Sequence, residues 1–187
     1  MSGTAADDGA TAAEVVRVAS RARVTVAVAE SLTGGAVTDA LVAVPGASAC
    51  LRGGVVAYAT DVKREVLGVD ADLLRRRGAV HPDVAVAMAA GVRALLGADY
   101  GVATTGVAGP DPQDGQPPGI VHVAVCGPHR TVVEPGGSPD GTVGRQAVRA
   151  AARDAALALL LEELRVAAPV RTDQDDADRD DGAPVPL

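Results

Sequence analysis

The sequence predicts an α/β protein in which helices cover both faces of a mostly parallel sheet, a three-layer sandwich. Strand-like apolar runs alternate with helical patterns along the chain, which is the arrangement that gives this fold class. Hydrophobic residues make up 48% of the chain although Phe and Trp are absent, so Val, Leu and Ala must form the core. The run at residues 24–29 is almost continuously apolar, as in a strand buried on both faces.

Each element follows from a local signal. The spacing of Thr11 and Glu14 fits a capping box that opens the first helix, and Pro45–Gly46 stops the second one. Asp70 is a candidate N-cap with Gly78 just past its helix, and His81 precedes a proline that opens the next helix. The expected helices cover residues 11–22, about 36–44, 70–77, 81–96 and 142–166, and the expected strands cover 24–29, 54–60, 100–104, 120–126 and 130–133.

The length of 187 residues fits one domain with tails. We expect a disordered segment at residues 1–10, a single domain at 11–168 and an acidic disordered tail at 169–187. The N-terminus lacks the basic start and apolar run of a signal peptide, and no window is apolar for the length of a membrane span. We therefore expect a cytoplasmic protein.

Composition excludes several functions. A net charge of −7 and two Tyr as the only aromatic residues argue against nucleic-acid binding and against anionic membranes. Two distant cysteines make no disulfide framework or zinc site, and the three histidines lack the spacing of metal ligands.

Two glycine- and hydroxyl-rich turns each follow an expected strand. The first contains Ser31, Thr33, Gly34 and Gly35, and the second runs from residue 104 to 111 and leads into a long Gly/Pro/Asp loop. Ligands in α/β sheets bind at the carboxyl ends of strands, so one shared pocket is an attractive interpretation. Two ordinary turns with a helix cap remain the alternative.

The chain has 16 Arg but a single Lys, Lys63, which follows the second expected strand together with Tyr58. A serine can be activated by a lysine that is held neutral, and Ser48 stands after a helix breaker. On spacing alone, an exposed turn lysine and a capping serine are the better explanation of these two residues. Arg145, Arg149 and Arg153 form a stripe on the last helix that is typical of a solvated face.

Together these segments resemble the C-terminal domain of the CinA (competence/damage-inducible protein A) family. The resemblance runs from about residue 24 to 152 and is carried by six short motifs in the family's order. They are Ala-Glu-Ser-x-Thr-Gly-Gly, Val-Pro-Gly-x-Ser, Gly-Gly-Val-Val-x-Tyr-x-x-x-x-Lys, Leu-Gly-Val, Gly-Ala-Val and Thr-Gly-x-Ala-Gly-Pro.

The resemblance implies an amidohydrolase that deamidates nicotinamide mononucleotide (NMN) to nicotinate mononucleotide and ammonia. It implies Ser48 as the nucleophile, Lys63 as its base and Tyr58 as a proton relay, with no metal and no cofactor. It also implies a homodimer. The nucleotide pocket implied by the resemblance is lined by Ser31, Thr33, Gly34, Gly35, Thr105, Gly106 and Arg145.

Two other functions stay open at this point. The first is a non-catalytic nucleotide-binding CinA-like protein, linked to competence or DNA damage. The second is an amidase that acts on another nucleotide-like amide.

Overall fold

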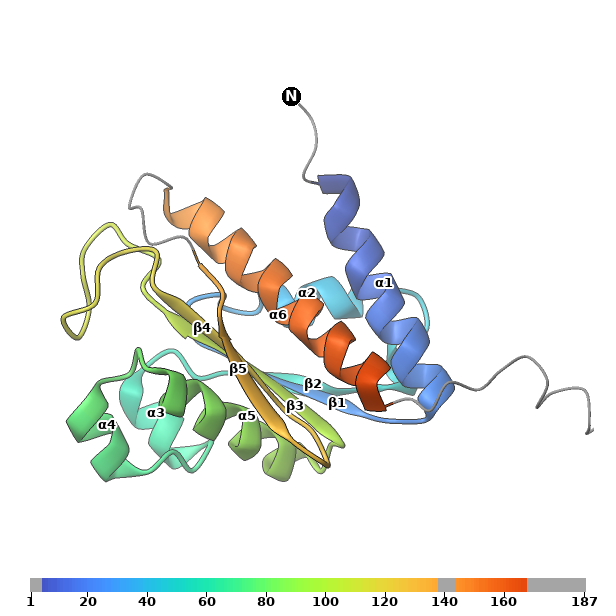
Figure 1. Cartoon of the computed structure of the whole chain (residues 1–187), viewed down its shortest axis with the longest axis horizontal. Coiled ribbons are helices and arrows are strands. Elements are labelled where there is room, and N and C mark those ends of the chain that lie inside the picture. The colour runs from blue at the N-terminus through green and yellow to red at the C-terminus, as the bar shows by residue number, and fades with distance from the viewer. Residues whose placement is uncertain (1–4, 138–143, 168–187) are drawn as a thin grey trace, which may run out of the picture.

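The computed structural model describes residues 5–137 and 144–167. A five-stranded sheet lies between two layers of helices, α1, α2 and α6 on one face and α3, α4 and α5 on the other (Figure 1). This is the α/β sandwich that the sequence predicted. The strands are β1 (Val26–Glu30), β2 (Leu51–Val56), β3 (Tyr100–Gly106), β4 (Val121–Cys126) and β5 (Thr131–Pro135). The helices are α1 (Ala5–Ala22), α2 (Ala36–Val42), the 3₁₀ turn η1 (Ala47–Ala49), α3 (Thr60–Glu65), α4 (Ala71–Arg77), α5 (Pro82–Leu96) and α6 (Arg145–Ala167).

The sheet is mixed rather than mostly parallel. Its strand order is β2-β1-β3-β4-β5, with β1 parallel to β2 and β3, and with β4 antiparallel to both of its neighbours. Parallel neighbours need a crossover, which helices provide between the first three strands. Only loops join β3 to β4 and β4 to β5, so the chain turns back directly.

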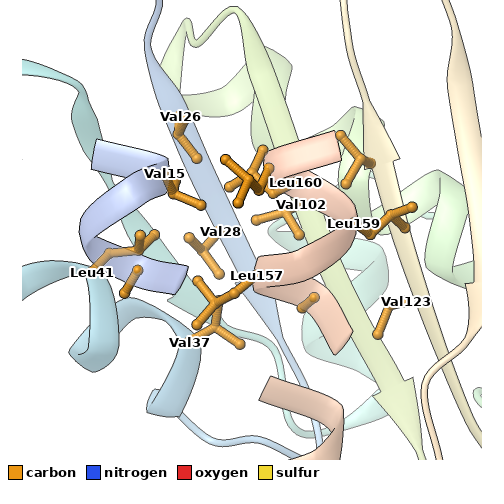
Figure 2. Packing of buried hydrophobic residues seen from close by; sticks show 14 of the residues in the cluster. Val15, Val26, Val28, Val37, Leu41, Val102, Val123, Leu157, Leu159 and Leu160 are labelled. Carbon is orange, nitrogen blue, oxygen red and sulfur yellow. The ribbon is translucent and has the colours of Figure 1, made fainter. Parts of the chain in front are cut away.

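The central strands divide the core by simple alternation. Val26 and Val28 of β1 face one side, where they pack with leucines of α6 (Figure 2). Ala27 and Ala29 face α5 on the other side. All five residues of β1 and all seven of β3 are buried. Successive side chains of a strand point to opposite faces, so a strand covered on both sides reads as a continuous apolar run. Small alanines on the α5 side let that helix approach closely.

Helix starts were predicted well where a cap is used. The Asp70 carboxylate accepts a hydrogen bond from Leu73 N–H at 2.8 Å, and His81 accepts one from Asp83 N–H at 3.2 Å. The expected cap at Thr11 was wrong, since α1 begins at Ala5 and includes residues 5–10 of the segment expected to be disordered.

Glu14 is not the capping-box partner of Thr11. Its carboxylate binds Arg17 on the same helix and Arg165 on α6 instead of closing a capping box at Thr11. The expected N-terminal residues of the last helix at 142–143 lie outside the described residues, as does the acidic segment 169–187.

Between β2 and α4 the sequence predicted no helix, yet α3 forms there. β2 begins at Leu51, three residues before the expected start, and ends at Val56, so the chain has room for the short helix. That helix decides where Lys63 lies.

Candidate active site

Lys63 is almost fully buried, with 1% of its surface exposed. It lies in α3, and its Nζ donates hydrogen bonds to Ser31 Oγ at 3.0 Å, Ala57 O at 2.8 Å and Tyr58 O at 3.0 Å. All three protons of an ammonium group would thus have an acceptor. An amine held in this way points at one hydroxyl, that of Ser31.

Burial changes the chemistry of this amine. Desolvation lowers the pKa of Lys63 from 10.5 to about 8, while the charge of Asp114 acts in the opposite direction and limits the fall. A low-dielectric environment disfavours the ammonium form, so the neutral amine becomes accessible near neutral pH. A neutral amine beside a hydroxyl can act as a general base.

Ser31 follows β1 at the carboxyl end of the parallel strands. Its backbone N–H donates to Thr104 O at 3.1 Å, so the end of β3 fixes the start of the turn, and the residue is 7% exposed. The sequence placed Ser31 among substrate-binding residues. The structure makes it the hydroxyl that is paired with the lysine.

Ser48 lies elsewhere. It is exposed in η1, just before β2, whereas Lys63 follows the other end of that strand. Because β1 and β2 are parallel, Ser48 is at the amino end of the sheet and Ser31 at the carboxyl end. A strand of this length separates the two ends by roughly 20 Å. The expected pairing of Ser48 with Lys63 is therefore corrected to Ser31 with Lys63.

The turn after Ser31 is shaped by Glu30, which is fully buried. Its carboxylate accepts hydrogen bonds from the N–H groups of Gly35, Val37 and Thr38 at 2.9, 3.1 and 2.8 Å, and from Thr38 Oγ1 at 2.7 Å. The sequence analysis expected this glycine-rich turn to line a nucleotide pocket. The protein's own carboxylate already occupies those donors.

Gly34 and Gly35 complete this turn next to Ser31. Both have left-handed backbone angles, with φ of +62° and +104°, that only glycine adopts without strain. Gly34 is exposed, so it remains available to a ligand.

The two threonines of the expected pocket are buried instead. Thr33 Oγ1 and Thr104 Oγ1 are 2.8 Å apart, and Thr105 Oγ1 donates to Ala79 O at 2.7 Å. Gly106 is also buried, and it has no room for a side chain, since a Cβ there would lie 2.6 Å from Ile120 O of the returning chain. These residues fasten the elements around the site to one another.

Tyr58 and Arg145 meet at the outer side of the site. Arg145 Nη2 donates to the Tyr58 hydroxyl at 3.1 Å, and Arg145 Nη1 donates to Gly109 O at 2.8 Å. Tyr58 is 59% exposed. The structure thus brings α6, the β2–α3 connection and the loop after β3 to one place.

Three residues near the site were missed by the sequence analysis as functional candidates. Arg149 was taken as part of a solvated stripe, but its guanidinium donates to the carbonyls of Leu32 and Thr33. Glu30 directly precedes Ser31 and Asp114 lies in the loop after the second turn, and neither had an assigned role. A Glu between an apolar strand and a glycine turn that opens a helix could have been suspected as a cap.

Two open hollows lie away from this cluster. One of about 520 Å³ lies between α1 and the C-terminal part of α6, and another of about 340 Å³ lies between α3 and α4. Neither is lined by Ser31 or Lys63.

Within residues 5–137 and 144–167, no group of three or more His, Cys, Asp or Glu side chains is arranged to hold a metal ion. In the same described part of the chain, no helix is both long and apolar enough to cross a bilayer. Cys50 and Cys126 are both buried free thiols.

The fold and the buried serine–lysine pair define an α/β protein with a candidate nucleophile at the carboxyl ends of its parallel strands. Residues 8–164 match the model of the CinA C-terminal domain, and the chain belongs to that family.

Relatives in sequence are much longer proteins. A CinA-like protein of Frankia casuarinae is 59% identical over 108 residues, which are 58% of this chain and 25% of the relative. A CinA-like protein of Synechococcus sp. is 51% identical over 124 residues, 66% of this chain and 30% of the relative. The chain thus matches only a quarter to a third of the length of these relatives.

Solved structures match nearly end to end. The competence/damage inducible protein CihA of Agrobacterium tumefaciens superposes with a TM-score of 0.80 at 33% identity, covering 88% of this chain and 99% of that one. The competence damage-inducible protein A of Klebsiella pneumoniae gives a TM-score of 0.79 at 34% identity, covering 84% and 97%.

Proposed function

We propose that this protein is an amidohydrolase that converts NMN to nicotinate mononucleotide and ammonia, with Ser31 as nucleophile and Lys63 as general base. The observation that carries the proposal is the 3.0 Å hydrogen bond between Lys63 Nζ and Ser31 Oγ inside the protein. The substrate comes from the resemblance to the CinA family, and the assignment of the nucleophile comes from the geometry. We also assign the reaction to the cytoplasm, where buried thiols stay reduced.

Acylation begins with neutral Lys63. Its Nζ takes the proton of the Ser31 hydroxyl while Oγ attacks the carboxamide carbon of the substrate. The tetrahedral oxyanion then collapses, the C–N bond breaks, and the proton passes from Lys63 to the departing nitrogen, which leaves as ammonia. The product of this step is an ester between Ser31 and the nicotinoyl group.

Deacylation repeats the same steps with water. Lys63, neutral again, takes a proton from water as the hydroxide adds to the ester carbonyl. The bond to Ser31 Oγ breaks, and the proton returns from Lys63 to the serine oxygen. The acid product ionises at neutral pH, and the site is restored.

The population of neutral Lys63 sets the working pH. With a pKa of about 8, roughly a tenth of the lysine is neutral at pH 7. An ordinary lysine would be neutral in fewer than about one molecule in a thousand at that pH. Burial therefore increases the active form by about two orders of magnitude.

The phosphate of the nucleotide needs a cation, and Arg145 is the one we propose. Its guanidinium bridges Tyr58 and Gly109 at the exposed side of the site, and it is itself exposed. An arginine can bind phosphate with two parallel hydrogen bonds. This local charge lets an acidic protein take an anionic substrate.

A second candidate is a nucleotide-binding protein without catalysis. The observation in its favour is that Ser31 is only 7% exposed, which leaves little of the hydroxyl open to a substrate. The names of the matched solved structures refer to competence or damage induction, and a sensor in such a response would need the pocket alone. A buried lysine aimed at a hydroxyl is then a costly feature without a use, which favours the enzyme.

The deciding experiment is ammonia release from NMN by the purified protein. Ser31→Ala and Lys63→Met are expected to lower the rate to background, while Ser48→Ala, matched to Ser31→Ala in chemistry, stays within twofold of the wild type. Circular dichroism verifies that each variant folds.

Each alternative has its own result. Release that survives Ser31→Ala but not Ser48→Ala would restore the nucleophile implied by the motif. NMN binding by calorimetry without ammonia release supports the non-catalytic protein. Ammonia release from another nucleotide amide, with none from NMN, would change the proposed substrate but leave the proposed reaction and its residues unchanged.

A further inference from the structure

Arg149 reaches from α6 to the turn that follows Ser31. Its Nε donates to Leu32 O at 3.0 Å and its Nη2 donates to Thr33 O at 2.7 Å, while Nη1 binds Gln146 Oε1 at 3.0 Å. The residue is half-buried, and α6 packs beside α2 at this point (Figure 1). One guanidinium therefore holds two successive carbonyl groups from a helix more than a hundred residues away in the chain.

These bonds fix the orientation of two peptide groups. In a trans peptide the carbonyl oxygen and the following N–H point to opposite sides. Holding Leu32 O toward Arg149 therefore turns the N–H of Thr33 away from α6, and holding Thr33 O does the same for the N–H of Gly34. The latter donates to Ser31 O at 3.2 Å, which closes the turn on the nucleophile.

Two donors in this turn are left over. Among the described residues, the N–H groups of Leu32 and Thr33 donate to no protein group, although they directly follow Ser31. Adjacent unpaired N–H groups behind a nucleophile are what an oxyanion-binding site requires. The carboxylate of Glu30 fixes the far end of the same turn through Gly35 and Val37.

We propose that Arg149 is a positioning residue for the oxyanion-binding site of Ser31. By holding Leu32 O it keeps the N–H of Thr33 free, and by holding Thr33 O it directs the N–H of Gly34 to Ser31 O, which closes the turn that carries the two free donors. This inference rests on the proposed amidohydrolase function. Arg149 itself does not touch the substrate. A donor on each carbonyl also polarises its peptide, so that the N–H on the other side becomes a stronger donor.

The side chain must be arginine for this task. The planar fork of a guanidinium reaches two acceptors at once, whereas an ammonium is a single point that cannot hold both in the same geometry. Charge alone is therefore insufficient, and Arg149→Lys is expected to behave more like Arg149→Gln than like the wild type.

The test uses the full chain with Arg149→Gln and Arg149→Lys, and with Arg165→Gln as the matched control. Arg165 is on the same helix but binds Glu14 on α1. Loss of one oxyanion donor lowers kcat by about 10²–10³-fold, so partial disorder of the turn is expected to lower kcat for NMN by roughly 10- to 100-fold. The KM is expected to change less than about threefold, and the control stays at wild-type values.

Two readouts do not depend on the natural substrate. The rate at which a fluorophosphonate labels Ser31, followed by mass spectrometry, is expected to fall in parallel with kcat because phosphonylation also develops an oxyanion. Hydrogen exchange of the Gly34 amide, followed by NMR, is expected to accelerate at least tenfold in both Arg149 variants and not in the control.

The outcomes separate the two proposals. A wild type that is labelled but releases no ammonia contradicts the NMN activity alone, and labelling then decides on Arg149. A rise in KM with kcat unchanged makes Arg149 a substrate-binding residue and overturns the inference. Unchanged labelling or unchanged Gly34 exchange in Arg149→Gln also overturns it, as does a wild-type Ser31 that the probe never labels.

Discussion

The ammonium nitrogen of Lys63 lies 3.0 Å from the hydroxyl oxygen of Ser31, although the two residues are 32 positions apart in the chain. The parallel pairing of β1 and β2 produces this contact, because residues that follow the two strands emerge at the same end of the sheet. The chain then enters α3, in which Lys63 is the one buried residue. The carbonyls of Ala57 and Tyr58 hold the amine from the other side.

The rate of ammonia release is expected to rise with pH until Lys63 is neutral. Because its pKa is about 8, kcat/KM falls tenfold for each pH unit below that value and levels off above it. A pH–rate profile from pH 6 to 10 measures this rise of kcat/KM, which we call the rising limb. A midpoint near pH 6.5 or below would contradict a lysine base.

Asp114→Asn is expected to move this limb to lower pH. The Asp114 charge raises the pKa of Lys63, so its removal favours the neutral amine and increases activity at pH 7. The asparagine oxygen can still accept the hydrogen bond from Ala79 N–H, which is 2.7 Å long in the wild type. Asp39→Asn, an exposed carboxylate on α2, is the control, and an equal shift in both variants would point to net charge alone.

Lys63 also makes stability depend on pH. Its pKa is about 8 when folded and close to 10.4 when unfolded, so between these values the unfolded chain binds more protons and stability rises with pH. Relative to Lys63→Met, the free energy of unfolding of the wild type is expected to increase by about 3 kcal/mol from pH 7 to pH 10.5. Urea unfolding at several pH values measures the difference, and a constant difference across this range would contradict the burial of a charged amine.

The layered fold could be predicted because the burial of a strand or helix determines the pattern of apolar residues in its sequence. The apolar run at residues 24–29 and the breaker at Pro45 reflect only local packing and backbone limits. The sheet was taken as mostly parallel because the connection after β3 was not counted. A segment of 14 residues without a helical pattern joins β3 to β4, which indicates a return of the chain rather than a crossover.

The partner of Lys63 could not be predicted in the same way. Ser31 follows one expected strand and Ser48 precedes the next one, but local signals do not show whether these two strands lie side by side. Parallel pairing of β1 with β2 decides it, and pairing is a long-range property. Arg149 was hidden for a related reason, since helical periodicity shows that it shares a face with Arg145 but not what that face covers.

Arg145 is expected to act on the phosphate rather than on the amide. Arg145→Gln removes the cation but keeps a donor, so the KM for NMN is expected to rise about tenfold or more, in line with loss of a charge-assisted hydrogen bond. The KM for nicotinamide riboside, which has no phosphate, is expected to change less than twofold. A parallel rise for both substrates would place Arg145 elsewhere in the mechanism.

Tyr58→Phe tests the bond between Tyr58 and Arg145. The hydroxyl accepts from Arg145 at 3.1 Å in an exposed position, so its loss is expected to alter stability by less than about 1 kcal/mol. If Tyr58 only orients Arg145, the effects of the two substitutions on the KM for NMN are not additive in the double variant. A separate fall in kcat in Tyr58→Phe would instead support the proton relay.

Glu30→Gln is expected to destabilise the protein although the two side chains have the same shape. Both carboxylate oxygens of Glu30 accept hydrogen bonds, from Gly35, Val37 and Thr38, and none of these partners can accept one in return through its N–H. An amide offers one oxygen, and its NH₂ group must face backbone donors. A buried, mismatched donor costs about 1–3 kcal/mol, and the lost charge on the acceptor adds to this.

We therefore expect the free energy of unfolding of Glu30→Gln to fall by about 3 kcal/mol, measured by urea denaturation. Glu65→Gln, an exposed residue on α3, serves as the control and stays within about 0.5 kcal/mol of the wild type. Equal stability of the Glu30 variant and the wild type would mean that the turn after Ser31 does not depend on this carboxylate.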